Sequence, residues 1–385
     1  SRNKMSEGDP YQPNNMYATC FDRETEGLTG TGWKRYYQLT KLDSVATLNT
    51  MTMKMEFQYP SMIHVYDYSG PMVHQMQRRL DILVTPNHRM LVSTNISSNN
   101  LERPRFIRAS EMVGRILAIQ VAAPWNDEQA IDREIFSLPL VQGSGHKGTF
   151  QPLQFESFRM DNWLEFLGWY LAEGSVWLGK GRWKHYYRTN LASNYRQREA
   201  LEMFKALGYK ACLQGSNNII TANKQLTMYL SQFGKSAQKF IPPEIKALPR
   251  EKLTILLGKL LAGDGHAHGH WWQYTTVSPR LADDVQEIAL KIGYSANISY
   301  DANNYKTKDG KNHGIYRVNI TQTRTAQVNQ IKGKSELIEY SGKVWCITVP
   351  NDTILARRSG APFFSGNSKV LGEQLVNSYV RKGYF

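Results

Sequence analysis

The chain has 385 residues, of which 41% are hydrophobic and 11% aromatic, and it carries a formal net charge of +14. This composition is that of a globular protein, and the length allows two or more domains with cores of their own. No apolar run reaches membrane-spanning length and the first residues show no signal pattern, so we expect no membrane partner.

The basic charge favours an anionic partner, of which nucleic acid is the commonest, and a basic solvated surface is the alternative. The cysteines Cys20, Cys212 and Cys346 lie far apart in the sequence. This spacing argues against a disulfide framework and predicts a reducing, cytoplasmic (intracellular) location.

Short strands and turn signals fill the first part of the chain. Residues 1–19 are polar, and from Cys20 to about Asn95 β-forming residues alternate between Gly, Pro and Asn, as in "SVATLNT" and "DILVTPNHRMLVS". The segment "VQGSGHKGTFQP" then has the composition of a linker. After Lys334 the pattern of strands returns, so we expect one β-rich domain that is split by an insert.

The insert contains four predicted helices in two similar halves. The first and third helices, "MDNWLEFLGWYLAEGSVW" and "PREKLTILLGKLLAGDGH", each end at an acid followed by Gly, and we expect the first to end on Gly174 as a C-cap. The second and fourth, "NYRQREALEMFKALGY" and "SPRLADDVQEIALKIGY", are amphipathic. Similar halves of this size predict a duplicated unit with a pseudo-twofold axis.

Two acids, Glu173 and Asp264, occupy matching helix ends in the two halves. Small residues would let these helices pack closely and bring both carboxylates to one pole: Gly168, Ala172, Gly174, Gly258, Ala262 and Gly263. Two adjacent negative charges repel, and hard ions such as Mg²⁺ take oxygen ligands and support phosphodiester hydrolysis. A solvated acid at each helix end is the alternative interpretation.

The motifs "FLGWYLAEG" and "LLGKLLAGDG" resemble the paired motifs of a LAGLIDADG (dodecapeptide) homing endonuclease. The resemblance covers residues 155–335 and implies a nuclease that cleaves double-stranded DNA, with Glu173 and Asp264 binding Mg²⁺ or Mn²⁺. The block "SAQKFIPPEI" implies that Lys239 lies beside the active site and polarises the attacking water or the phosphate.

Basic residues are dense in the segments expected to face DNA, where phosphate contacts would make affinity depend on salt. They are Lys180, Arg182, Lys184, Arg188, Lys306, Lys308, Lys311 and Arg317. Three histidines at alternate positions, His266, His268 and His270, share one strand face. A zinc site is one interpretation, but we favour a strand that leaves the active site.

The flanks, "CFDRETEGLTGTGWKRYYQL", "LVTPNHRMLV" and "KVWCITVPNDTILARRSGAPFFSGNS", together resemble the splicing blocks of an intein. The resemblance spans Cys20 to Asn367, so Thr19 and Ser368 would be the flanking extein residues. It implies autocatalytic protein splicing of the Hint fold, without a cofactor, and a double-stranded DNA target at an intein-less host site.

The resemblance assigns a role to each splicing residue. Cys20 would attack the carbonyl of Thr19 to give a thioester, with His88 as general acid and Thr85 as the oxyanion-side donor. Ser368 would then accept the acyl group, and Asn367 would cyclise and cut the chain after itself. Cys346 stands where many relatives carry an Asp that helps to activate the downstream nucleophile.

Two positions depart from the family pattern. Gly366 and Asp352 stand where the family commonly has histidines. General acid–base help for Asn367 must therefore come from another group, and we expect a slow C-terminal step.

The sequence thus predicts a multidomain, monomeric chain, in which an all-β Hint (horseshoe) domain is interrupted by an α/β endonuclease with two αββαββα repeats. The expected segments are an N-extein remnant, the two parts of the splicing domain, the endonuclease between them and a C-extein remnant: 1–19, 20–150 and 336–367, 151–335, and 368–385. Alternatives are an intein whose insert only binds DNA, a DNA endonuclease with decayed splicing, and flanks from a host enzyme.

Overall fold

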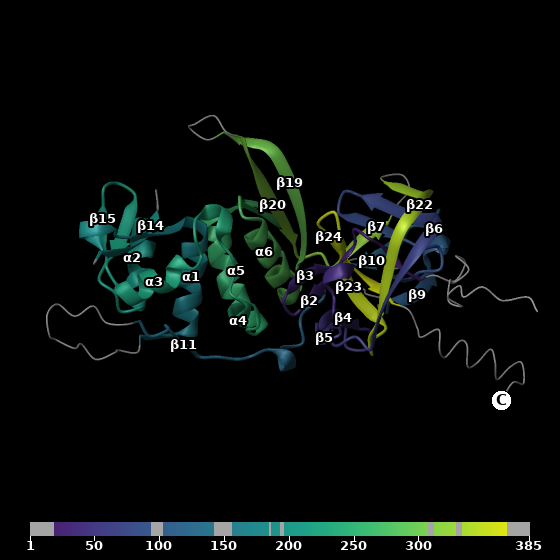
Figure 1. The fold of residues 1–385 in the computed structure, drawn as a ribbon, viewed down its shortest axis with the longest axis horizontal. Helices are drawn as coiled ribbons and strands as arrows, with labels where there is room; N and C mark the ends of the chain where they lie inside the picture. Colours follow the sequence, from purple (N-terminus) through teal and green to yellow (C-terminus); the bar gives the residue numbers. More distant parts are fainter. Residues whose placement is uncertain are drawn as a thin grey trace, which may run out of the picture. The chain divides into compact units, whose positions relative to one another are not determined.

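The computed structural model describes residues 19–93, 103–141, 156–184, 186–192, 196–306, 312–328 and 333–367. The chain divides into two compact units. Residues up to Val121, with those from Arg324 onward, form the β unit, and residues 122–323 form the α/β unit. Both ends of the chain therefore build one unit, as the purple and yellow strands in Figure 1 show.

Three sheets make up the β unit. A closed barrel has the strand order β1-β22-β6-β7, a second sheet has the order β21-β10-β8-β9, and a six-stranded sheet has the order β24-β23-β2-β4-β5 with β3 beside β2. The barrel strands are β1 (Phe21–Asp22), β6 (Met62–Gln77), β7 (Leu80–Val84) and β22 (Lys334–Thr348). The others are β2 (Glu26–Thr29), β3 (Gly32–Arg35), β4 (Val45–Asn49), β5 (Lys54–Gln58), β8 (Arg89–Ser93), β9 (Arg105–Arg108), β10 (Leu117–Gln120), β21 (Thr325–Val328), β23 (Thr353–Arg358) and β24 (Ala361–Gly366).

Long-range pairing joins the two halves of the β unit. Strand β22 pairs antiparallel with β6, and the register runs from Lys334 opposite Met76 to Thr348 opposite Met62. The core of this unit contains apolar side chains from both halves, such as Phe21, Trp345 and Phe363. Burial of each large side chain contributes about 2 kcal/mol. Because each half supplies only some of these side chains, neither half has a complete core alone.

The α/β unit contains two sheets with the same strand order, β13-β14-β16-β15 and β17-β18-β20-β19, and a β11-β12 pair. Its strands are β11 (Ile135–Ser137), β12 (Ser157–Arg159), β13 (Gly174–Leu178), β14 (Tyr187–Ala192), β15 (Cys212–Gln214), β16 (Asn218–Thr221), β17 (Gly265–His268), β18 (Trp271–Thr276), β19 (Ser295–Lys306) and β20 (Asn312–Thr321). Its helices are α1 (Met160–Glu173), α2 (Gln197–Ala206), α3 (Lys224–Ser231), α4 (Pro243–Lys246), α5 (Arg250–Asp264) and α6 (Pro279–Ile292). No helix in the described ranges is long and apolar enough to cross a membrane.

The units divide at residues 121/122 and 323/324, earlier than the expected 150/151 and 335/336. Strand β10 pairs with β21 and completes the β unit just before the first of these points. The next residues pack in the α/β unit instead, since the Trp125 amide donates to the Lys291 carbonyl oxygen at 2.9 Å.

Helices α1 and α5 pack through part of the expected small-residue faces. A Cβ atom at Gly168 would lie 2.8 Å from the Lys259 Cβ, and one at Gly263 would lie 2.4 Å from the Ala172 Cβ. Gly258 has no such neighbour within 4 Å, so its assignment to this interface was wrong.

Gly174 is the C-cap of α1, as expected, and its amide donates to the Tyr170 carbonyl oxygen. Its φ is −87°, and strand β13 begins there without a left-handed residue. Glycine is needed for close packing instead, because a Cβ would lie 2.6 Å from the Tyr170 carbonyl oxygen.

Candidate functional site

Cys20 directly precedes β1, and Thr85, the residue after β7, holds its backbone. Its amide donates to Thr85 Oγ1 at 2.9 Å, and the Thr85 amide donates to the Cys20 carbonyl oxygen at 3.0 Å. Thr85 directly follows β7, and β7 pairs with β1. The Thr85 hydroxyl therefore contacts the nitrogen of the Thr19–Cys20 peptide bond.

The thiols of Cys20 and Cys346 are neighbours. Strands β1 and β22 pair Phe21 with Trp345, which places the two cysteines opposite each other, and their sulfur atoms are 3.4 Å apart. Both side chains are buried. The hydrogen bond with Cys346 and, second, burial raise the pKa of Cys20 well above its usual value, so Cys20 is a thiol at neutral pH.

His88 is fully buried between the two ends of the β unit. Its Nε2 lies 2.8 Å from Ser365 Oγ, and its ring packs 4.4 Å from the Phe21 ring. Burial lowers the pKa of His88 to about 4, and the charge of Arg89 acts in the same direction, whereas the backbone of Thr19 and of Gly366 favours the protonated form. One imidazole thus interacts with the backbone of Thr19, at the first predicted junction, and of Gly366, one residue before Asn367.

Asn367 follows β24 and is completely buried. Its amide donates to the Asp352 carbonyl oxygen at 3.0 Å, and its own carbonyl oxygen accepts from Arg89 Nη1 at 3.4 Å. Within the described ranges, its side-chain Nδ2 and Oδ1 have no hydrogen-bond partner. Ser368 lies outside the described residues.

Cys20, Thr85 and Cys346 lie in or beside strands of the barrel. His88 directly precedes β8 and Asn367 directly follows β24, so strands of all three sheets of the β unit position these residues. Arg89 and Ser365, which contact this group, were not predicted from the sequence. Both are sequence neighbours of predicted residues, but nothing in the local pattern distinguishes them from ordinary strand residues.

In the α/β unit, the ends of α1 and α5 bring two carboxylates close together. Burial raises the pKa of Asp264 to about 7, and the charge of Glu173 adds to this shift. The Tyr274 hydroxyl is buried and, in the part of the chain that the structure describes, has no hydrogen-bond partner. Burial and then both acids raise its pKa.

The Lys239 ammonium caps helix α1. Its Nζ donates to the carbonyl oxygens of Tyr170 and Gly174, both at 2.9 Å, and of Ala172 at 3.5 Å. Burial lowers the pKa of Lys239 to about 8, while Asp264 and Glu173 oppose this shift. The Lys239 ammonium group lies near both acids, but its N–H groups donate to carbonyl oxygens at the C-terminal end of α1.

The acid pair fits a hard divalent cation. Two repelling carboxylates supply oxygen ligands, and Mg²⁺ is commonly held by one or two carboxylates together with substrate phosphates and water. Among the described residues, no set of three or more His, Cys, Asp or Glu side chains could hold a metal ion. The zinc interpretation of His266, His268 and His270 therefore gains no support.

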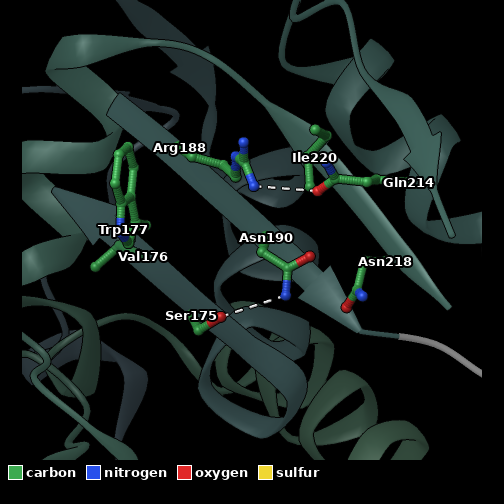
Figure 2. A pocket seen from close by; sticks show the side chains of 8 residues that line it. All are labelled: Ser175, Val176, Trp177, Arg188, Asn190, Gln214, Asn218 and Ile220. Atoms are coloured by element: carbon green, nitrogen blue, oxygen red, sulfur yellow. Dashed lines mark hydrogen bonds between the residues drawn. The ribbon is translucent and has the colours of Figure 1, made fainter. Parts of the chain in front are cut away.

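One face of the first sheet of the α/β unit is a polar hollow of about 420 Å³ (Figure 2). Its rim carries Arg188, whose Nη1 donates to Gln214 Oε1 at 3.1 Å, and Asn190, whose Nδ2 donates to Ser175 Oγ at 3.3 Å. Trp177 and Asn218 also line it. Of these residues only Arg188 was predicted from the sequence, because amides and hydroxyls form no charge pattern.

The other predicted DNA contacts are distributed differently. Lys180, Arg182 and Lys184 are exposed in the connection between β13 and β14, not in a strand. Arg317 lies in β20 but pairs with Asp301 at 3.0 Å. Lys306 ends β19, and Lys308 and Lys311 lie outside the described residues.

The chain thus combines a split β unit with an inserted α/β unit in which two acids lie at matching helix ends. Residues 251–328 match the family model described as "LAGLIDADG-like domain", which confirms the LAGLIDADG resemblance over these residues.

Curated relatives align over nearly the whole chain. The ATP-dependent Clp protease proteolytic subunit of Chlamydomonas moewusii is 28% identical, over 93% of this chain and 36% of that protein. The DNA-directed RNA polymerase subunit beta C-terminal section of Stigeoclonium helveticum is 27% identical, over 94% of this chain and 38% of that protein. The chain thus spans little more than a third of the length of either relative.

Two solved structures are similar to parts of the fold. The AceL NrdHF class 3 split intein has 8% identity and a TM-score of 0.33, and the match covers 91% of this chain and all of that one. I-DmoI in complex with DNA and Mn has 12% identity and a TM-score of 0.32, over 42% of this chain and 90% of that one.

Proposed function

We propose that this chain is a bifunctional intein that splices itself out of a host protein and also cleaves double-stranded DNA. The observation that carries the splicing proposal is the single buried site that contains Cys20, His88 and Asn367, although they are far apart in the sequence. The unrelated names of the relatives support an inserted element, since the chain aligns with only part of each.

The first step follows from the contacts at Cys20. Its sulfur attacks the Thr19 carbonyl carbon, the peptide bond breaks, and the thiol proton ends on the Cys20 nitrogen. Neutral His88 can accept that proton and pass it on, because its pKa is near 4. Thr85 holds the leaving nitrogen through its hydroxyl.

In the later steps, each proton that a nucleophile loses is transferred to the group that leaves. The Ser368 hydroxyl attacks the thioester, and its proton restores the Cys20 thiol. The Asn367 side-chain nitrogen then attacks the Asn367 carbonyl carbon and releases Ser368 as an amine, after which the ester between Thr19 and Ser368 rearranges to an amide. We assign Cys346 to the control of the Cys20 thiol, because its sulfur lies 3.4 Å away.

For DNA cleavage, Glu173 and Asp264 would hold Mg²⁺ or Mn²⁺, which would activate water and stabilise the leaving oxygen. Lys239 fixes the end of α1 and so positions Glu173. The polar hollow that contains Arg188, with the exposed lysines nearby, would contact DNA through phosphates and base edges.

The variant Asn367→Ala tests the splicing proposal. It should leave a thioester or branched species and abolish cleavage after residue 367, as measured by gel and mass spectrometry. Normal splicing of this variant would refute the assignment. For the nuclease, a candidate intein-less site should be cut in Mg²⁺ and left intact in EDTA, whereas binding without cutting would leave a DNA-binding insert.

A further inference from the structure

We propose that Ser365 is a positioning residue for the first splicing step, because its hydroxyl holds the His88 ring with Nε2 protonated and Nδ1 free to accept the Cys20 proton. This inference rests on the proposed splicing function and deepens it. Ser365 lies in β24, shortly before Asn367, and His88 directly precedes β8. The Ser365 Oγ and His88 Nε2 atoms are 2.8 Å apart, although their positions in the sequence differ by 277.

The surroundings of the Ser365 hydroxyl determine where its proton lies. The side chain is completely buried, so its hydrogen bonds must be made within the protein. Besides His88 Nε2, the oxygen lies 3.4 Å from the Arg89 carbonyl oxygen and 3.5 Å from Met90 Sδ, and both of these atoms only accept hydrogen bonds. If the hydroxyl proton pointed at the ring, its lone pairs would face the carbonyl oxygen, which repels them. The proton is therefore directed at one of these two acceptors, and a lone pair of Oγ faces the imidazole.

This arrangement selects one tautomer of His88. A neutral imidazole has one N–H donor and one bare nitrogen, and the hydrogen bond at one nitrogen decides the state of the other. Since the Ser365 oxygen accepts at Nε2, that nitrogen carries the proton and Nδ1 is bare. Burial keeps the ring neutral, with its pKa lowered to about 4. Among the described residues, Nδ1 is buried and has no hydrogen-bond partner, so its lone pair is available.

The same ring is held at the first junction, where a proton must be moved. It packs 4.4 Å from the Phe21 ring, and the backbone of Thr19 interacts with it. The Cys20 thiol proton moves to Nδ1 as the sulfur bonds to the Thr19 carbonyl carbon. Nδ1 then gives this proton to the Cys20 nitrogen as the peptide bond breaks. Between these two transfers the ring is an imidazolium, and the Ser365 oxygen still accepts from Nε2.

The opposite tautomer would block this step, because an Nδ1 that carries hydrogen cannot accept a proton from a thiol. A His88 ring without a partner at Nε2 can adopt either tautomer, so the active fraction falls. A hydroxyl group on β24 thus controls the chemistry at the first junction.

The test compares Ser365→Thr with Ser365→Val in the full chain with Asn367→Ala, because the two new side chains have the same shape and only the first carries a hydroxyl. Hydroxylamine cleaves the thioester after Thr19, and mass spectrometry follows the released segment. Ser365→Val should cleave about tenfold more slowly than Ser365→Thr, which is the loss expected for one buried hydrogen bond. Equal rates would overturn the proposal.

Thr29→Val is the matched control, because it removes a buried hydroxyl from the same sheet, where Thr29 Oγ1 donates to the Gly32 carbonyl oxygen at 2.7 Å. It should leave the cleavage rate unchanged. If Thr29→Val slows cleavage as much as Ser365→Val does, the effect belongs to any buried hydroxyl of this sheet, and the proposal is wrong.

The tautomer itself gives a second measurement, which needs no substitution at Ser365. In the full chain with Cys20→Ala and Asn367→Ala, nitrogen NMR of the His88 ring distinguishes the protonated nitrogen from the bare one, and His88→Gln assigns the signals. The proton should lie on Nε2. A proton on Nδ1 would overturn the proposal even if neither Ser365 variant folds.

The variant Cys20→Ala separates this inference from the proposed function. If Cys20→Ala abolishes hydroxylamine cleavage while Ser365→Val and Ser365→Thr cleave equally fast, only the role of Ser365 is wrong. If Cys20→Ala still cleaves after Thr19, the splicing assignment fails as well.

Discussion

Two glycines of helix α5 provide a paired test of the interface that brings Glu173 and Asp264 together. Gly258→Ala introduces a Cβ with no neighbour within 4 Å, and it should stabilise the α/β unit by about 1 kcal/mol through helix propensity. Gly263→Ala introduces a Cβ at 2.4 Å from the Ala172 Cβ. That atom is fixed to the backbone of α1 and cannot rotate away.

The gain in helix propensity is similar for both substitutions. The difference between the two variants in the free energy of unfolding therefore measures the cost of the close contact at Gly263. Overpacking costs about 1–3 kcal/mol, and we expect Gly263→Ala to be less stable than Gly258→Ala by this amount. Urea unfolding, analysed for the transition of the α/β unit, measures the difference. Gly263→Ala should also slow DNA cleavage, because it separates the acids.

Equal stability of the two variants would refute the reasoning, since the close contact of α1 with α5 would then not exist. A loss of stability in Gly258→Ala would contradict the placement of Gly258 outside the interface. Both outcomes can be read from the same urea curves.

Four further predictions concern the titration of Cys20, the titration of Asp264, DNA cleavage by the acid pair and DNA binding. In Asn367→Ala, hydroxylamine-trapped N-terminal cleavage should accelerate about tenfold per pH unit between pH 6 and 8, because the raised pKa keeps Cys20 protonated; a flat profile would contradict this. Because burial raises its pKa from 3.8 to about 7 in the folded state, Asp264 should destabilise the metal-free fold progressively as the pH rises from about 4 to 7, with no further loss above that range. In EDTA, the urea midpoint of Asp264→Asn should lose this pH dependence. Glu173→Gln should abolish DNA cleavage in Mg²⁺ without loss of binding, measured by nicking and fluorescence anisotropy. Arg188→Gln should lower the salt slope of DNA binding by about one, and an unchanged slope would exclude a phosphate contact.

Capping residues in the sequence indicate where several helices begin and end. Helix α6 lies within the fourth predicted helix. It begins after Ser278, whose side chain accepts the Leu281 amide, and ends at Gly293 with φ at 100°. These signals involve neighbours in the chain, so they can be read without tertiary structure. Gly174 shows the limit, because its glycine serves close packing and not a left-handed turn.

The splicing residues could be named from their motifs, but their contacts could not. The barrel pairs β6 with β22, segments more than 250 residues apart, and only this pairing puts Cys346 opposite Cys20. Arg89 gave no signal, because its partner Asn367 is 278 residues away. Lys239 was expected near the acids, but its donation to the end of α1 depends on how that helix packs.

Mass spectrometry of the full chain after expression tests the central claim most directly. Splicing predicts two products, the excised segment 20–367 and a peptide in which Thr19 is joined to Ser368. Asn367→Ala and Cys20→Ala should each prevent the joined peptide from forming. An intact chain that persists after prolonged incubation at neutral pH would contradict the account.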